Sequence, residues 1–452
     1  MTGTHHPSAR PDSRDDTLDV LVVGAGVSGL AVLRELDRAG LHVLCVEARD
    51  RIGGRIFSVR DPFCPLPVEL GAEFVHGRSP ALWSLLTDAR APIYEASDDF
   101  IHVRAGKRKD DQEIESGVGR LMDEVKAHKN GEPDQTFADF CRQSTYAAET
   151  KQWAESYVEG FNAARSEVIG VASLAEDARA ADQIDGDRSF RVLSGYDSVP
   201  RHLLNGVPEV DRKLRLNSVV ESVDWHPGRV ITTVRSSTTG RVDIYRSRSV
   251  VLTVPLGVLQ AEANQHGAIE FRPRPHQALD AAQQLAFGQV FRVVLRFDQA
   301  FWEQNPNLVD AGFVLSEEQF FPTWWTPLPV RAPFITGWSA SRHAEGLFGL
   351  DKSTIVEKAL ASLAHIIGRQ PSRLEQAYFH DWHADPFARG AYSYVPAGAL
   401  PARKVLATPV DGTLYFSGEA TELSGHSATV HGALAAGQRT ATQILAAARS
   451  WK

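Results

Sequence analysis

The chain has 452 residues, of which 43% are hydrophobic and 23% charged, a composition ordinary for a soluble globular protein large enough for two connected domains. The net charge of −8 is spread along the sequence, so no basic face indicates a nucleic acid or a membrane surface as partner. Three widely spaced cysteines fit neither a disulfide framework nor a zinc site. No apolar run approaches the ~18 residues of a membrane span, and the polar residues 1–17 lack the core of a secretory signal. We expect a disordered tail over 1–17 and a cytoplasmic protein, monomeric or homodimeric.

The most informative stretch, residues 18–47, predicts a strand, a tight turn, a helix and a second strand. An apolar, β-branched run over 20–23 is typical of a strand buried on both faces. A GxGxxG turn follows, in which the first glycine permits the turn, the second admits a pyrophosphate and the third brings helix and strand together. These glycines are Gly24, Gly26 and Gly29. Glu47 stands near the spacing expected of the acid that binds ribose hydroxyls. The pattern favours dinucleotide binding over an ordinary glycine-rich turn.

A second glycine loop comes directly after Glu47. Arg49 and Arg55 flank Gly53 and Gly54, and arginine is the charge-assisted partner of phosphate, although a solvated basic turn would look similar. The succession of GxGxxG, an acid and RxGGR resembles the flavin-dependent amine oxidases. That family includes monoamine and polyamine oxidases, L-amino-acid oxidases and histone lysine demethylases.

Three later segments also resemble motifs of this family: residues 68–77, the strand around Val220, and residues 414–437. The resemblance implies an α/β fold with a Rossmann-like FAD-binding domain of the GR2 type (18–78, 190–270 and 402–452). It implies an interleaved α+β substrate-binding domain over 79–189 and 271–401. The implied FAD-binding residues are Gly24, Gly26, Gly29, Glu47, Arg49, Gly54, Arg55, Gly71, Ala72, Glu73, Val220, Gly418, Glu419 and Val430. Ala391 replaces the cysteine that attaches FAD in monoamine oxidases, so we expect non-covalent FAD.

The same resemblance implies five catalytic residues. Trp382 and Tyr392 belong to a segment similar to the family's W-x-x-D-P…G-x-Y motif, in which Tyr392 forms one wall of an aromatic pair. Thr429 stands where monoamine oxidases place the opposite tyrosine. His76 falls where several polyamine-oxidising relatives carry a histidine or glutamate, although a hydrogen-bonded histidine at a strand end would also fit. Arg292 replaces the usual lysine, which holds a water near flavin N5, and arginine does not deprotonate usefully.

Elsewhere the sequence predicts a helical lobe and a second sheet. Helices are expected over 81–89, 117–128, 136–141, 147–161, 197–205 and 355–367, and a solvated loop over 104–115. Strands are expected over 230–235, 242–245, 249–254, 291–297, 312–315, 320–326 and 334–339.

Oxidation of an amine at its α-carbon requires a neutral nitrogen, because an ammonium does not release hydride. An apolar, aromatic-walled pocket disfavours the charged form by desolvation. The flavin carries the redox chemistry, so no metal or nucleophile is required, and the sequence shows no candidate metal cluster. We therefore predict FAD-dependent oxidation of a primary amine or polyamine by hydride transfer to flavin N5, with O2 as the acceptor that gives H2O2.

Three alternatives stay open. An L-amino-acid oxidase would use an arginine for the substrate carboxylate, with Arg78 and Arg389 as candidates. A flavin dehydrogenase or desaturase would not use O2, and Arg292 is the feature that favours it. A non-catalytic protein would retain FAD only as a structural element.

Overall fold

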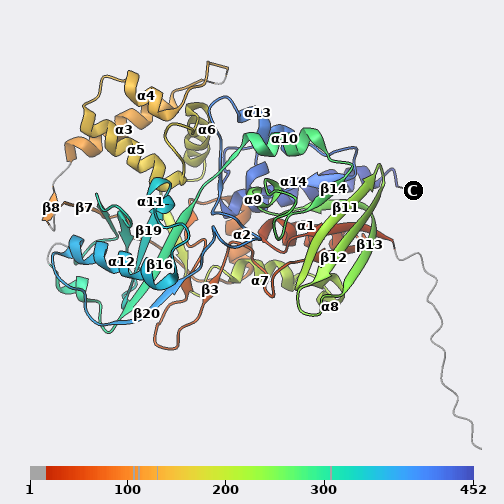
Figure 1. Ribbon diagram of the computed structural model, residues 1–452, viewed down its shortest axis with the longest axis horizontal. Coiled ribbons are helices and arrows are strands. Elements are labelled where there is room, and N and C mark those ends of the chain that lie inside the picture. Colours follow the sequence, from red (N-terminus) through yellow and green to blue (C-terminus); the bar gives the residue numbers. More distant parts are fainter. Residues whose placement is uncertain (1–16, 105–106, 110–111, 130, 306–307, 452) are drawn as a thin grey trace, which may run out of the picture.

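The structure, a computed structural model, describes residues 17–104, 107–109, 112–129, 131–305 and 308–451. The tail predicted over 1–17 lies outside the described residues except for Thr17. Two large sheets lie side by side, and the chain passes between them more than once (Figure 1). Segments far apart in the sequence therefore meet where the two sheets face each other. No helix in the described part of the chain combines the length and apolarity needed to cross a bilayer.

The first sheet has eight strands. In order across the sheet they are β10 (Leu214–Arg215), β2 (Val43–Val46), β1 (Leu18–Val23), β13 (Val242–Leu252), β12 (Arg229–Ser236), β11 (Ser218–His226) and β14 (Glu270–Arg272), and β22 (Leu414–Phe416) also pairs with β13. β1 runs parallel to β2 and to β13. Two strands predicted over 242–254 are one, because β13 pairs first with β12 and then with β1 and β22.

Strand β1 is buried on both faces, as its apolar run predicts. Val20 and Val22 belong to one core cluster, and Leu21 and Val23 belong to the cluster on the opposite face. The first face is covered by α1 (Val27–Arg38), α2 (Pro80–Asp88), α7 (Ser198–Asn205) and α14 (Val430–Ala448). The second is covered by α9 (Leu256–Leu259), α10 (His276–Gln284) and α13 (Leu400–Leu406). Because α1 starts directly after β1, its N-terminus lies at the carboxyl edge of the parallel strands.

The second sheet has seven strands. Their order is β20 (Leu374–Phe379), β16 (Val290–Phe297), β19 (Phe334–Ala340), β18 (Thr323–Trp325), β17 (Phe313–Ser316), β7 (Phe100–Arg104) and β8 (Lys107–Lys109). Helix α12 (Lys352–Ile367) packs on one face, where Phe291, Val293 and Leu295 of β16 join its core cluster. Side chains alternate along a strand, so Arg292 lies on the other face, where it contacts Gly71 and Glu73.

The helical lobe consists of α3 (Gln112–Lys126), α4 (Phe137–Gln143), α5 (Ala148–Asn162) and α6 (Val171–Asp182), at the upper left of Figure 1. The solvated loop predicted over 104–115 is wrong for its described residues. β7 and β8 form a hairpin there, and α3 begins at Gln112. β7 pairs with β17, more than 200 residues later, and no local pattern encodes that partner.

Shorter elements join the two halves. They are β3 (Ser58–Val59), β4 (Val68–Glu69), β5 (Val75–His76), β6 (Ile93–Glu95), β9 (Ser189–Val192), α8 (Val210–Lys213), β15 (Ala286–Phe287), α11 (Arg342–Glu345) and β21 (Ser393–Tyr394), with 3-10 turns at Phe301–Gln304 and Glu419–Thr421. β5, β9 and β6 form a small three-stranded sheet in which β9 is central.

Candidate active site

A cavity of about 1400 Å³ lies between the two sheets and the helical lobe. It extends from Glu47 and Val220 on the first sheet to Trp325 and Trp338 on the second. Ordinary ligand pockets measure ~300–1,000 Å³, so this volume has room for a dinucleotide and a second small molecule.

Each of the three glycines in the first turn has a different structural role. Gly24 has φ +104°, a conformation that other residues rarely adopt. A Cβ on Gly29 would lie 1.9 Å from the carbonyl oxygen of Gly24, so only glycine lets α1 pack this close to the turn. A Cβ on Gly26 would meet no atom within 4 Å and would project into the cavity. Gly26 is therefore an open backbone cradle at the N-terminus of α1, which fits a pyrophosphate.

Glu47 closes the nucleotide end of the cavity. Its buried carboxylate accepts hydrogen bonds from the backbone N–H of Ala25 (2.7 Å) and of Arg49 (3.0 Å). The guanidinium of Arg49 donates to Asp385 (2.8 Å), which also contacts the His380 ring at 2.9 Å. Burial alone would raise the pKa of Asp385, but His380 and Arg49 outweigh it and hold the pKa well below its usual range. Asp385 is thus an anionic anchor for Arg49, a role that the sequence did not suggest.

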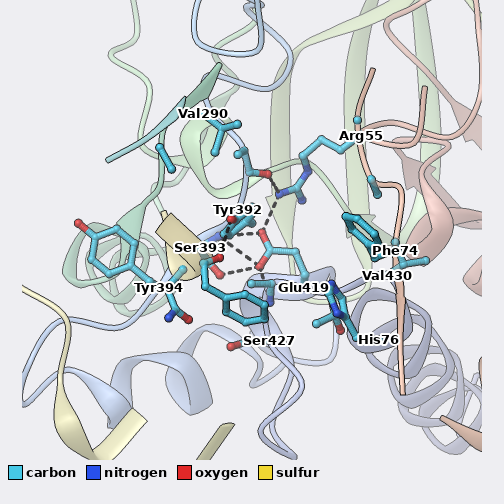
Figure 2. A pocket seen from close by; sticks show the side chains of 18 of the residues that line it. Arg55, Phe74, His76, Val290, Tyr392, Ser393, Tyr394, Glu419, Ser427 and Val430 are labelled. Atoms are coloured by element: carbon cyan, nitrogen blue, oxygen red, sulfur yellow. Dashed lines mark hydrogen bonds and ion pairs between the residues drawn. The ribbon is translucent and has the colours of Figure 1, made fainter. Parts of the chain in front are cut away.

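The Glu419 carboxylate is held entirely by protein donors. It accepts from Arg55 (2.8 Å), from the Ser393 hydroxyl (2.6 Å) and from the backbone N–H of Ala428 (3.1 Å). Figure 2 shows the contacts of Arg55, Glu419 and Ser393 as one network in the cavity wall. Arg55 also donates to the Ala391 carbonyl (2.7 Å). The network joins the second glycine loop to the C-terminal motif and holds the wall in place at the middle of the cavity.

Helix α14 points its N-terminus into the cavity. Thr429 caps it, since its hydroxyl accepts from the Gly432 N–H at 2.9 Å and donates to the His426 carbonyl at 2.7 Å. Thr429 and Val430 both line the cavity. The first N–H groups of a helix lack intrahelical acceptors and carry partial positive charge, so this end favours an anionic ligand atom.

Gly71 and Ala72 form a tightly clamped part of the wall. A Cβ on Gly71 would lie 1.9 Å from the Arg55 carbonyl oxygen and 3.2 Å from the Trp382 ring. Trp382 donates its indole N–H to the Leu70 carbonyl at 2.7 Å, so its ring is fixed against this segment. These contacts hold the backbone of Gly71 and Ala72 in place where it lines the cavity.

Arg292 reaches the cavity wall from β16 and is buried there. It donates to the Glu73 carboxylate (2.5 Å) and to the Gly71 carbonyl (3.0 Å). Glu73 also accepts from Arg191 (2.7 Å) and from the indole N–H of Trp325 (3.0 Å). Burial would raise the pKa of Glu73, but the charges of Arg292 and Arg191 outweigh it and lower the pKa. Glu73, predicted as a cofactor ligand, has both oxygens engaged by protein donors.

The far part of the cavity has aromatic walls. The Tyr392 hydroxyl donates to the Phe161 carbonyl at 2.8 Å, and burial raises the pKa of Tyr392. The His76 ring lies 6.0 Å from Phe74 and 5.8 Å from Phe161, centroid to centroid. In Figure 2, Phe74 and His76 lie on the side of Val430. Burial lowers the pKa of His76 to about 4, so its imidazole is neutral at neutral pH.

Sequence reasoning missed the contribution of α5. Trp153, Tyr157 and Phe161 line the cavity, and the last two are 49% and 57% exposed. Their spacing of four residues puts all three aromatic rings on one face of the helix. This periodicity was the available signal.

The cavity brings together every predicted site residue except Gly29, which lies behind the turn. The residues that line it are Gly24, Gly26, Glu47, Arg49, Gly54, Arg55, Gly71, Ala72, Glu73, His76, Val220, Arg292, Trp382, Tyr392, Gly418, Glu419, Thr429 and Val430. Arg78 and Arg389 are not among the described residues that line it; Arg78 stacks on Trp83, and Arg389 donates to the His266 carbonyl. The open cradle at Gly26, the acid at Glu47 and the helix N-terminus at Val430 fit FAD.

Comparisons with known proteins agree with this geometry. The profile of the family described as flavin containing amine oxidoreductase matches residues 27–445. The chain is 27% identical to polyamine oxidase 3 of Oryza sativa subsp. japonica, over 95% of this chain and 90% of that protein. It is 26% identical to lysine-specific histone demethylase 1 homolog 2 of the same organism, over 98% of this chain but only 59% of that protein.

Solved structures show the same fold at lower identity. Wild-type putrescine oxidase bound to putrescine superposes with a TM-score of 0.77 at 23% identity, covering 95% of this chain and 99% of the other. Cyclohexylamine oxidase from Brevibacterium oxydans gives a TM-score of 0.78 at 20% identity, covering 96% and 100%. The predicted α/β fold, with its Rossmann-like FAD-binding part and substrate-binding part, is confirmed. The chain belongs to the flavin-containing amine oxidoreductases, enzymes whose cofactor is FAD.

Proposed function

We propose that the chain oxidises a primary amine or a polyamine with non-covalently bound FAD and passes the electrons to O2, giving H2O2. The observation that carries the proposal is the single cavity that joins the Gly26 cradle to the aromatic chamber around Tyr392. A cofactor that extends along it from Glu47 would end where Thr429 and Val430 line the wall. FAD, when bound, supplies the acceptor for a hydride from the α-carbon of the amine.

The protein groups bind, orient and desolvate. The N–H groups at the start of α14 would stabilise negative charge, and the clamped Gly71–Ala72 backbone would support a planar ring. Tyr392 and the aromatic side chains beside it would exclude water from the amine. His76 is neutral and would accept a hydrogen bond from an amine N–H rather than repel it.

The cavity gives little support to the alternative function, that of an L-amino-acid oxidase. A substrate carboxylate needs a cationic partner in a desolvated site. Arg78 and Arg389, the two candidates from the sequence, are engaged elsewhere. An L-amino-acid substrate would therefore need a different cationic partner, and Lys151, Arg188 and Arg342 also line the cavity.

An anaerobic screen tests the proposal. Purified yellow protein is mixed without oxygen with monoamines, polyamines and L-amino acids, and the oxidised-flavin absorbance is followed. We expect bleaching by an amine without a carboxylate, then recovery of the band and release of H2O2 when air is admitted. Bleaching without recovery in air would favour a dehydrogenase, and a protein that no amine bleaches would contradict the proposal.

A further inference from the structure

Asp385 connects the two large sheets at the nucleotide end of the cavity. It follows β20 of the second sheet, and Arg49, which follows β2 of the first sheet 336 residues earlier, donates to it at 2.8 Å. Both side chains are largely buried, at 13% exposure for Arg49 and 7% for Asp385. Arg49 lines the cavity, whereas Asp385 is not among the described residues that do so. Asp385 can therefore act on a bound cofactor only through the residues that it holds.

The surrounding segment holds the Asp385 carboxylate in one place. The backbone N–H of Asp385 donates to the Asp381 carbonyl at 3.0 Å. One carboxylate oxygen accepts from the backbone N–H of Phe387 at 2.9 Å, and the other contacts the His380 ring at 2.9 Å. These contacts fix the carboxylate independently of Arg49, so the long arginine side chain adapts to Asp385 rather than the reverse.

The Arg49 guanidinium lies between two carboxylates but pairs closely with only one of them. It is 2.8 Å from Asp385 and 3.8 Å from Glu47, and the second distance is too long for a hydrogen bond. Glu47 instead accepts from the backbone N–H of Ala25 on one oxygen and from that of Arg49 on the other. Because a carboxylate has about four acceptor sites, these two bonds leave Glu47 with room for ligand hydroxyls.

Asp385 also places an aromatic ring on the cavity wall. Phe387, whose backbone N–H donates to Asp385, lines the cavity, and the centre of its ring lies 5.6 Å from the guanidinium carbon of Arg49. The ring also packs closely against the first-sheet side of the cavity, because a Cβ on Gly267 would lie 3.1 Å from it. Arg49 and Phe387 thus form one continuous part of the wall, and Asp385 fixes both.

We propose that Asp385 is a positioning residue for FAD, which holds the Arg49 guanidinium away from Glu47 and so keeps that carboxylate free to accept the ribose hydroxyls. Among the described residues, Glu47 is the other carboxylate within 4.0 Å of Arg49. Without the charge of Asp385, Arg49 would pair with Glu47 and occupy the lone pairs that the ribose needs. The inference concerns the cofactor alone, so it holds whichever amine the protein oxidises.

A double-mutant cycle on FAD affinity tests the proposal. The dissociation constant of FAD is measured by flavin fluorescence for the apoproteins of the wild type, Asp385→Asn, Arg49→Met and the double variant. We expect Asp385→Asn to raise it at least about tenfold, because asparagine keeps the shape but loses the charge that draws Arg49 away from Glu47. In the Arg49→Met background the same substitution should change it by less than about twofold, since no guanidinium remains to be positioned.

A role of Asp385 in structural support alone would give a different result. Residues 381–393 also carry Trp382 and Tyr392, which line the cavity, so a loosened segment would shift the absorbance bands of the bound flavin. It would also weaken FAD by the same factor in both backgrounds. Either result overturns the inference. Asp280→Asn, which removes the charge of an exposed aspartate paired with Arg274, is the matched control and should leave the dissociation constant unchanged.

If the Asp385→Asn apoprotein does not fold, as judged by its melting temperature, Asp385→Glu takes its place. Glutamate keeps the charge beside Arg49, so the dissociation constant of FAD should stay within about threefold of the wild type. A larger rise overturns the inference. Failure here leaves the proposed amine oxidation standing, because FAD binding is measured without substrate. A flavin that no amine bleaches contradicts that function and leaves the role of Asp385 intact.

Discussion

The nucleotide end and the amine chamber of the same cavity are built in different ways. The nucleotide end consists mainly of backbone, at Gly24, at Gly26 and in the first turn of α1. It adds one acidic side chain, Glu47, and all these residues lie within thirty consecutive positions. The chamber consists of side chains, from β5, α5, β18, β19 and the start of α14. At Gly29 the backbone leaves no room for an added atom, and at Gly26 an added atom would occupy the space meant for the cofactor, whereas a wall of side chains can be changed one residue at a time. The first part therefore carries the glycine motif of the family, and we expect the second to decide which amine binds.

Substitution of Gly29 should have the largest effect, because it is predicted to break the fold rather than the site. In Gly29→Ala the Cβ would clash with the Gly24 carbonyl oxygen at 1.9 Å, so α1 must move away from β1. We expect a loss of about 3 kcal/mol or more in the free energy of unfolding, measured by denaturant titration. Gly119→Ala, where a Cβ inside helix α3 meets nothing within 4 Å, is the control and should stabilise the protein by up to about 1 kcal/mol.

Gly26→Ala should damage the site and spare the fold. Gly26 has φ −74°, which alanine adopts freely, and its Cβ would project into open cavity. We expect the melting temperature of the apoprotein to stay unchanged while the dissociation constant of FAD, measured by flavin fluorescence, rises at least about tenfold, or ~1.4 kcal/mol. Unchanged FAD affinity would show that the pyrophosphate does not lie against Gly26.

Because His431 is buried in the chamber, we expect the free energy of unfolding to depend on pH. Burial, and then the neighbouring His426 and His76, lowers the pKa of His431 to about 3. Its folded pKa is thus below the unfolded value of ~6.5, so the unfolded state takes up a proton first and stability is lost as pH falls below that value. The wild type should lose about 2 kcal/mol more than His431→Gln between pH 7.5 and pH 5. Equal losses in the two proteins would contradict a buried neutral imidazole.

The smallest expected effect concerns Tyr392. Tyr392→Phe removes the hydrogen bond to the Phe161 carbonyl but keeps the aromatic wall. We expect a stability loss of about 1 kcal/mol and anaerobic bleaching within about tenfold of the wild-type rate. Tyr392→Ala, which opens the wall, should slow bleaching much more. If both variants slow it equally, the hydroxyl rather than the ring is what the amine requires.

Most strands and helices were predictable because their signals are local. The burial of β1 on both faces follows from its apolar run, and the end of α12 follows from Gly368, which adopts φ +70° there. The β7–β8 hairpin was not predictable, because its partner strand β17 lies more than 200 residues away. The charged run Lys107–Lys109 is typical of a loop, and only its pairing with β7 identifies it as a strand.

The sequence by itself determined the dinucleotide turn, the acid at Glu47 and the family, because these depend on backbone geometry that a few consecutive residues specify. Only the tertiary structure decided which side chains meet in the chamber. Arg191 and Arg292 lie 118 and 219 residues after Glu73 in the sequence, yet both donate hydrogen bonds to its buried carboxylate. The charge of each is visible in the sequence, but its effect depends on burial and on distance to its partners, and both arise only when β9 and the segment around Glu73 pack against β16.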